Sequence, residues 1–412
     1  MVFKNAFPKR TFNNNYLSVT TSALLQLAIQ FLAINNIKKN ELQLSNYKLG
    51  ALFQKDQTVL FNKVLIKAQN DNDRKISEEN LYHQYLQSQT LAEFAVKNNS
   101  RNYYNHLLLS KQALDDFYAL TRLKFDIEQL TQQNVFNINQ QQGQDETTNY
   151  LIEKNTSESP AIIIYKQLYI MLSNSDKDEH YEKFYDTLIK NVSHLNNEDV
   201  FATYAYAMNY CVRKVNEGKQ HFQIELLKLY KFALQNDLLL TDGNIHYLNY
   251  KNIVSAGLRN NEIDWTEQFI IEYKSKLKKE VRKNAFNYNL ANLHFYKSEY
   301  GKAQTKLLNI DFTDVYYAMD YRALLLKIYF EQTAFDALDN LLSAFAVFVR
   351  RNKKASANMK RLYLNQIKFT KQLSNTSPRN KKRLQLIKER IANTQQVGDR
   401  NWLNQKIDEF LT

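Results

Sequence analysis

The side chains that most often carry chemistry are scattered along this chain. Its seven His residues, at positions 83, 106, 180, 194, 221, 246 and 294, form no HExxH motif and no i, i+4 ligand pair with a carboxylate. Asp176, Asp178 and His180 alternate as metal ligands can, but the central Gly and distal Glu of a calcium loop are missing. We interpret them as the capped start of a helix. The sequence therefore predicts a protein that is not an enzyme and that has no cofactor.

The single cysteine, Cys211, lies in a run with helical spacing, and no nucleophile motif surrounds it. We predict that it is a buried, small apolar residue. One cysteine excludes an intrachain disulfide framework, and the N-terminus lacks the basic, apolar and small-residue order of a secretory signal. These observations predict a reducing, cytoplasmic setting.

Positive charge is concentrated near the C-terminus. Between Arg350 and Arg390 there are fourteen Lys and Arg residues and one acid, Glu389, so this segment carries +13, which equals the net charge of the whole chain. It covers two predicted helices, at about 356–373 and 379–393. The candidate contact residues of this basic patch are Arg350, Arg351, Lys353, Lys354, Lys360, Arg361, Lys381, Lys382 and Arg383.

Three interpretations of the basic patch remain open. It is the solvated outer face of a terminal repeat, which such arrays require, or it binds an acidic protein, or it binds the phosphates of a nucleic acid. A membrane surface fits less well, because the apolar faces of these helices are needed for the core.

Aromatic residues recur at a fixed interval in the second half of the chain. Trp265, Tyr300 and Phe335 are 35 residues apart, and each follows a polar turn and precedes a run with helical apolar spacing. A period of about 34 residues is typical of stacked helix hairpins, which bury their apolar faces only against their neighbours.

The stretch 289–303 resembles a tetratricopeptide repeat. Leu290 and the small Ala291 occupy the close-approach positions of the first helix, Tyr300 begins the second, and Ala303 lets the two helices touch. The whole chain also resembles, more loosely, bacterial helical repeat proteins without an assigned activity. The matching elements of that second likeness are Phe7, Pro8, Asn13, Phe31, Leu32 and 209–214.

The neighbouring units match the tetratricopeptide pattern less well. Ala256 and Trp265 keep their positions, but Gln268 replaces a small residue. Phe335 also keeps its position, whereas Leu326 and Leu338 stand where small residues are expected. The resemblance covers about 245–350, and an irregular helical bundle remains the alternative.

The resemblance implies a right-handed α-solenoid of helix hairpins that acts as a non-catalytic protein–protein interaction scaffold. A partner would lie in the groove lined by the first helices of the repeats. The groove candidates in the best unit are Tyr288, Asn292, His294 and Phe295. The alternative function is association with nucleic acid through the basic patch.

Glycine and proline are scarce. The chain has 7 Gly and 3 Pro, against about 29 and 21 at average usage, which is too few for the turns of a many-stranded fold. The sequence therefore predicts an all-α protein with no sheet. Gly218 and Gly243 follow helical runs, where we expect turns that need positive φ.

The most apolar stretch is 17–34, about the length of a short membrane span. Its polar members favour a buried helix and no membrane insertion; they are Ser18, Thr20, Thr21, Ser22, Gln26 and Gln30. Before it, Val2, Phe3, Ala6 and Phe7 repeat at helical spacing up to Pro8. This pattern resembles the last turns of a helix and predicts a missing segment upstream, which a search of the gene for an extended reading frame would test.

Four segments follow from these patterns. Residues 1–132 form an N-terminal helical layer, whose start we predict to be truncated. Residues 133–160 form a polar linker that contains the Gln-rich tract 140–144. Residues 161–350 hold tetratricopeptide-like repeats, and 351–412 form basic capping helices.

Overall fold

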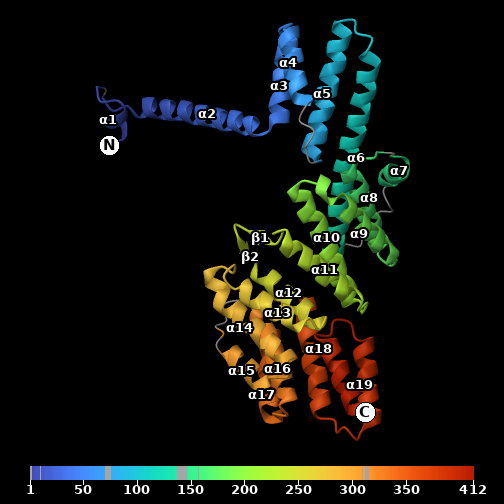
Figure 1. Ribbon diagram of the computed structural model, residues 1–412. Helices are drawn as coiled ribbons and strands as arrows, with labels where there is room; N and C mark the ends of the chain where they lie inside the picture. Colours follow the sequence, from blue (N-terminus) through green and yellow to red (C-terminus); the bar gives the residue numbers. More distant parts are fainter. Residues whose placement is uncertain are drawn as a thin grey trace. The chain divides into compact units, whose positions relative to one another are not determined.

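The computed structural model describes residues 2–9, 11–69, 76–136, 146–155, 157–308, 310 and 315–412. They contain twenty α-helices, which confirms the predicted all-α class (Figure 1). The chain divides into two compact units, Met1–Tyr210 (unit 1) and Cys211–Thr412 (unit 2). This division falls inside the segment 161–350 that we assigned to the repeats.

Unit 1 is built from consecutive helices that pack in pairs. Contacts join α3 to α4 and α5, α5 to α6, α6 to α8, and α8 to α9. The helices are α1 Val2–Ala6, α2 Asn14–Lys39, α3 Glu41–Gln54, α4 Thr58–Gln69, α5 Glu78–Lys97, α6 Tyr103–Phe136, α7 Glu146–Lys154, α8 Pro160–Ser173, α9 Glu179–Asn191, the short 3₁₀ helix Val192–His194 and α10 Asn197–Asn216, which crosses into unit 2. Phe61 of α4 and Phe94 of α5 stack with ring centroids 4.1 Å apart, inside a small apolar core.

The segment predicted as a polar linker contains helix α7. Leu151 and Thr148 of this helix are buried, and the Thr148 hydroxyl donates a hydrogen bond to the carboxylate of Asp126 in α6. The tract 140–144 lies outside the described residues.

Unit 2 is built from packed helix pairs. Helices α12, α14, α16 and α18 pack on one another in succession, and each also contacts the helix that follows it. The helices are α11 Phe222–Gln235, α12 Tyr247–Arg259, α13 Ile263–Glu272, α14 Lys279–Tyr296, α15 Tyr300–Leu308, α16 Val315–Glu331, α17 Phe335–Arg351, α18 Ala357–Ser374, α19 Lys381–Asn393 and α20 Arg400–Leu411. Trp265, Tyr300 and Phe335 each lie at or near the start of the second helix of a hairpin, as their spacing predicted.

The expectation of no sheet is wrong in one detail. β1 (Leu240–Thr241) pairs antiparallel with β2 (Asn244–Ile245) in a two-residue hairpin. Asp242 and Gly243 form its turn with φ of 50° and 73°, because the twist of a tight hairpin requires positive φ at both central positions. Gly218 also has positive φ, at 98°, so both glycine predictions are confirmed.

The close approach of α12 to α13 depends on Gly257, the neighbour of Ala256. A Cβ at Gly257 would collide with Thr266 Oγ1 and come 3.1 Å from the Trp265 ring. Thr266 is held in place because its hydroxyl donates to the Glu262 carbonyl at 2.6 Å. We expect Gly257→Ala to lower the free energy of unfolding of unit 2 by about 1–3 kcal/mol, measured by urea titration.

Gly301→Ala in α15 is the matched control, since no heavy atom lies within 4 Å of a Cβ there. Alanine favours a helix over glycine, so we expect this variant to unfold at the same or a slightly higher urea concentration, by up to about 1 kcal/mol. Equal stability of the two variants would contradict a close crossing at Gly257.

Candidate functional site

No group of three His, Cys, Asp or Glu side chains that could hold a metal occurs in the part of the chain that the structure describes. Cys211 is fully buried, which confirms its predicted environment. Asp176 and Asp178 precede α9 and His180 lies in its first turn.

The groove candidates Tyr288 and Asn292 lie on α14. Tyr288 is only 7% exposed, and its ring packs edge-on against Tyr317 at 5.2 Å. Burial and the nearby carboxylate of Asp320 raise the pKa of Tyr288. Asn292 is half-buried and donates its amide to the Tyr288 carbonyl at 3.3 Å. Both residues are thus engaged inside unit 2.

His294 and Phe295 are engaged in the same way. His294 Nδ1 is 2.6 Å from a carboxylate oxygen of Glu299. Phe295 is half-buried, packs against the core of unit 2, and carries the Lys327 ammonium 4.5 Å from its ring centroid. Periodicity placed these residues on α14 correctly but could not show which neighbours would cover them.

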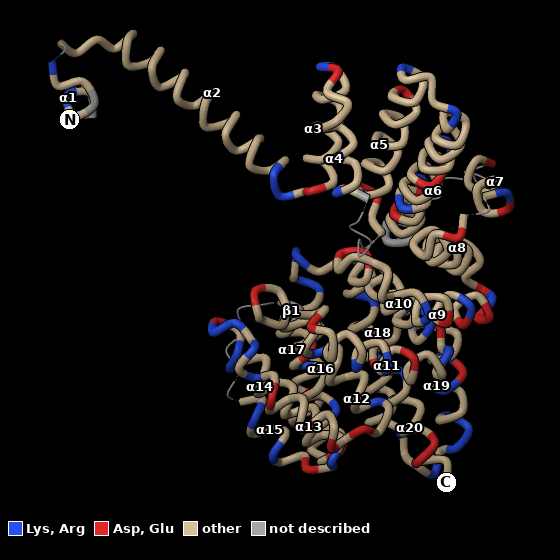
Figure 2. Tube along the Cα trace, turned by 45° about the horizontal axis from the view of Figure 1, so that its top comes forward, with Lys and Arg blue, Asp and Glu red and all other residues tan. Residues whose placement is uncertain are grey.

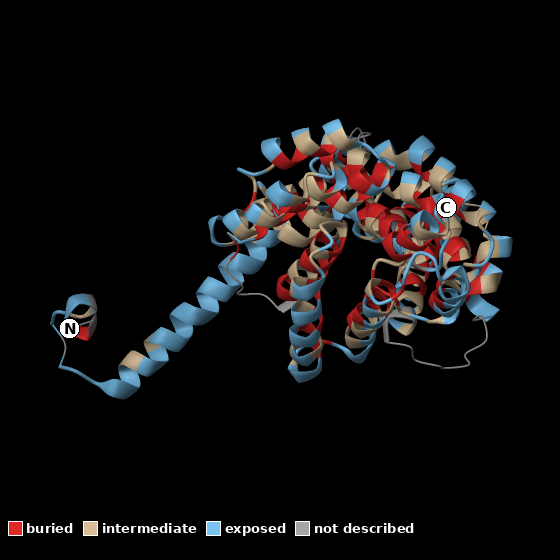
Figure 3. Cartoon of the chain, turned by 90° about the horizontal axis from the view of Figure 1, so that it is seen from below, coloured by how far each residue is buried: buried red, intermediate tan, exposed pale blue. Residues whose placement is uncertain are grey.

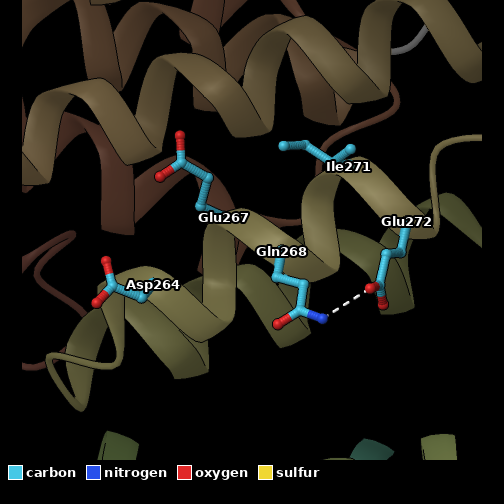
Figure 4. Close-up of a pocket in the computed structure, with 5 residues that line it drawn as sticks. All are labelled: Asp264, Glu267, Gln268, Ile271 and Glu272. Atoms are coloured by element: carbon cyan, nitrogen blue, oxygen red, sulfur yellow. Dashed lines mark hydrogen bonds between the residues drawn. The ribbon is translucent and has the colours of Figure 1, made fainter.

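A shallow acidic recess lies on the outer face of α13 instead, and sequence reasoning missed it (Figure 4). Gln268 donates to Glu272 at 2.7 Å across this face, and Glu267 accepts from Lys297 at 2.6 Å, a hydrogen bond that raises the pKa of Lys297. Its five lining residues recur every three or four positions, which was a visible signal; they are Asp264, Glu267, Gln268, Ile271 and Glu272. Chemically, the recess offers carboxylates to a basic group and nothing more.

The structure divides the predicted basic patch into two clusters. The first surrounds the turn between α17 and α18, and the second begins α19, after the far end of α18. Because α18 has 18 residues, its two ends are about 27 Å apart. Lys and Arg are drawn in blue in Figure 2.

The first cluster, which we call the α17–α18 corner, consists of Arg350, Arg351, Lys353, Lys354, Lys360 and Arg361. Among the described residues, none of these six side chains has a carboxylate within ion-pair distance. Arg361 donates to the Gln396 side chain at 3.0 Å and Lys360 only approaches the Arg350 carbonyl, at 3.5 Å. Like charges therefore crowd one surface without compensation.

The second cluster contains Lys381, Lys382 and Arg383. Lys381 has a structural role, because its ammonium donates to the carbonyls of Phe410 and Leu411 at 2.7 and 2.6 Å, at the C-terminal end of α20. A cation there satisfies the unpaired carbonyls of the last helical turn. Lys382 and Arg383 are exposed.

Unit 1 contributes most of the exposed large apolar side chains of the described chain. On α6 four of them form one stripe at helical spacing, namely Leu107, Leu114, Tyr118 and the 71% exposed Phe125. On α2 no residue is buried, and Figure 3 shows this helix exposed along its length.

The prediction that 17–34 forms a buried helix is therefore wrong. Its apolar side chains have no covering layer in the structure, and by length and composition alone α2 is long and apolar enough to cross a membrane, with a mean hydropathy of 1.7. Such a helix near an N-terminus is weak support for a membrane span.

Comparison with known proteins gives no match to a family model, to a curated protein or to a solved structure.

Proposed function

We propose that this protein is a non-catalytic interaction scaffold, a right-handed tetratricopeptide-like solenoid that works in the reducing cytoplasm and binds an acidic protein partner. The succession of α12, α14, α16 and α18, each paired with its following helix, supports the solenoid. The uncompensated charge of the α17–α18 corner is the observation that carries the binding role.

The corner fits an acidic partner for a physical reason. Six side chains of one sign lie on a turn and the helix ends that flank it, and the described residues offer them no carboxylate. Their mutual repulsion is relieved when a partner supplies negative charge. The internal engagement of the α14 residues gives no comparable support to a groove centred on Tyr288.

Nucleic acid is the second candidate, and the division of the basic patch bears on it. A phosphate backbone presents charge at regular intervals, so a continuous basic track would favour it. The two clusters lie toward opposite ends of α18, about 20 Å apart from Arg361 to the end of the helix, and only Lys368 and Lys371 carry positive charge on α18 between them. A compact acidic site on a protein is the better match for one corner alone.

Neutralising the corner should weaken binding selectively. For the variant R350Q/R351Q/K353Q/K354Q we expect the affinity for a polyglutamate peptide to fall by about 5- to 150-fold, because four exposed ion pairs contribute about 1–3 kcal/mol together. Fluorescence anisotropy at two salt concentrations measures this change, with a single-stranded oligonucleotide as the second probe.

The control R379Q/K382Q/R383Q removes three exposed charges from the second cluster and the turn before it. It should change the affinity by no more than about threefold, since only the general field is reduced. The nucleic-acid candidate would be supported if the unmodified protein binds the oligonucleotide more tightly than polyglutamate, and if the slope of log affinity against log salt concentration falls by about 3 in the corner variant. Equal losses in both variants would refute a role for the corner.

A further inference from the structure

From Asn14 to Ile37 the surface of α2 carries no charge, and no other part of the described chain buries it. No Asp, Glu, Lys or Arg occurs between Asn14 and Ile37, and no residue of α2 is buried. Leu24 is 60% exposed, Phe31 63% and Leu32 65%. An uncharged apolar helix in water is expected to bury a face against another surface.

The rest of the chain is poorly placed to supply that surface by a simple hairpin. A single residue, Asn40, separates α2 from α3, and it serves as the C-cap of one and the N-cap of the other. Its side chain accepts a hydrogen bond from Gln43 N at 3.0 Å. Antiparallel helices need a connection of about 2–5 residues, so α2 cannot fold back along α3.

Five residues of α2 share one face. Leu24, Leu25, Ala28, Phe31 and Leu32 recur at the spacing that brings side chains together on a helix, with the small Ala28 at their centre. We name these five residues the α2 face. Gln26 and Gln30 lie opposite it, and exposed apolar side chains such as Val19 and Leu27 also lie outside it.

The order of residues along α2 is close to palindromic about Ala28. Counting outward in both directions, Leu24 corresponds to Leu32, Leu25 to Phe31 and Thr21 to Asn35. A two-fold interface brings residue i of one copy against residue j of the other, and j against i. An antiparallel pair of helices with its axis at Ala28 would thus match apolar with apolar and polar with polar at these three pairs of positions.

We propose that the α2 face binds the α2 face of a second copy of this chain, antiparallel, with the two Ala28 residues at the crossing point. A small residue there lets the helix backbones approach closely, while the four large apolar side chains of each copy pack around it. Because residues 14–37 carry no charged side chain, the pairing of the two helices over this stretch buries no charge. This self-association does not depend on the proposed scaffold role.

The alternative occupant, a lipid bilayer, fits the two mid-helix amides of α2 poorly. At 26 residues α2 is about 39 Å long and could span the hydrocarbon layer. Thr20 and Thr21 donate to carbonyls of the preceding turn, at 2.8 Å each, but Gln26 and Gln30 lie mid-helix, where hydrocarbon would surround their amides. In the antiparallel pair those amides stay in water.

The expected contact is small. Eight large apolar side chains, at roughly 60–120 Å² each, bury about 500–1,000 Å², which is below the size of a standard stable interface. We therefore expect a reversible dimer with a dissociation constant in the micromolar range.

Sedimentation velocity of the full chain over about 1–200 µM tests the proposal. The unmodified protein should shift from monomer to dimer, and Ala28→Glu should stay monomeric at every concentration, because it sets two carboxylates against each other at the axis. Gln30→Glu adds the same charge to the opposite face and should dimerise like the unmodified protein, with less than a threefold change. Circular dichroism checks that both variants keep their helix content.

Disulfide trapping tests the direction of the pair. Ala28→Cys should give a covalent dimer on mild oxidation, whereas Leu24→Cys should not, because residues 24 of the two copies would lie about 12 Å apart along the axis. The unmodified protein, whose single cysteine is the buried Cys211, is the control for background oxidation. A protein that is monomeric throughout, equal dimerisation of Ala28→Glu, equal trapping at both sites, or co-flotation with phosphatidylcholine vesicles would each overturn the proposal.

Discussion

Replacing Glu331 by alanine should lower the free energy of unfolding of unit 2 by about 3–5 kcal/mol, the usual cost of removing one partner from a buried ion pair. Glu331 ends α16, and its side chain is 11% exposed. Its carboxylate accepts from Trp402 Nε1 at 2.7 Å and from Lys406 Nζ at 2.9 Å, both on α20. The variant leaves an indole N–H and an ammonium without this acceptor.

Lys406 must remain charged for this result, and its surroundings support that. Burial lowers the pKa of Lys406, but its hydrogen bonds to Glu409 and Glu331 act in the opposite direction and leave the pKa above its usual value. Only 9% of the Lys406 side chain is exposed, so water cannot replace Glu331 efficiently.

Urea unfolding followed by tryptophan fluorescence measures the effect in unit 2 alone, because Trp265 and Trp402 are the only two tryptophans of the chain and both lie there. The double variant Glu331→Leu with Lys406→Met should recover most of the loss, since it removes both charges together. Glu409→Ala, at a 47% exposed carboxylate, should cost less than about 1 kcal/mol. If Glu331→Ala lowers the free energy of unfolding by less than about 1 kcal/mol, the contact of Glu331 with α20 does not stabilise unit 2 as proposed.

Local patterns in the sequence were sufficient for the hairpins of unit 2. The 35-residue recurrence of Trp265, Tyr300 and Phe335 marked three helix starts. The predicted helices 356–373 and 379–393 agree closely with α18 and α19, because cap residues and apolar spacing are properties of the segment itself. The burial of Cys211 followed from the same reasoning.

Features that depend on distant neighbours were not accessible in this way. Composition alone could not show that α2 has no covering layer, because a buried helix and an exposed apolar helix share that composition. Residues that are close in sequence were assigned to one basic patch, but α18 separates them into two clusters. The repeat pattern identified Ala256 as the small residue of the α12 helix and did not single out Gly257, one position on, which faces Thr266. A shift of one residue on a helix turns the side chain by about 100°.

The ion pair between Lys327 and Asp399 should make the stability of unit 2 sensitive to acid. Lys327 of α16 is 9% exposed, and its ammonium lies 2.5 Å from Asp399 Oδ2, just before α20. Burial raises the pKa of Asp399, but the positive charges of Lys327 and Arg259 lower it more, so the pKa of the folded protein lies below the ordinary value. The ordinary value is about 3.9 in an unfolded chain.

A carboxylate whose pKa is lowered on folding stabilises the protein fully above its unfolded pKa, and this contribution is lost as the pH falls through its folded pKa. We therefore expect Lys327→Met to lower the free energy of unfolding by about 2–4 kcal/mol at neutral pH, because Asp399 loses its nearest cation. The difference between the variant and the unmodified protein should narrow as the pH falls below about 4, because Asp399 is protonated first in the variant, and it should be lost only below the lowered pKa that Asp399 has in the unmodified folded protein.

Urea titrations at pH 7, 5 and 3.5, again followed by tryptophan fluorescence, measure this difference directly. Lys388→Met is the matched control, because its partner Asp408 is 54% exposed and solvent already screens the pair. That variant should lose less than about 1 kcal/mol at every pH. A loss in Lys327→Met that stays constant from pH 7 to 3.5 would show that Lys327 stabilises unit 2 by packing against Phe295, whose ring centroid lies 4.5 Å from its ammonium, and not through the charge of Asp399.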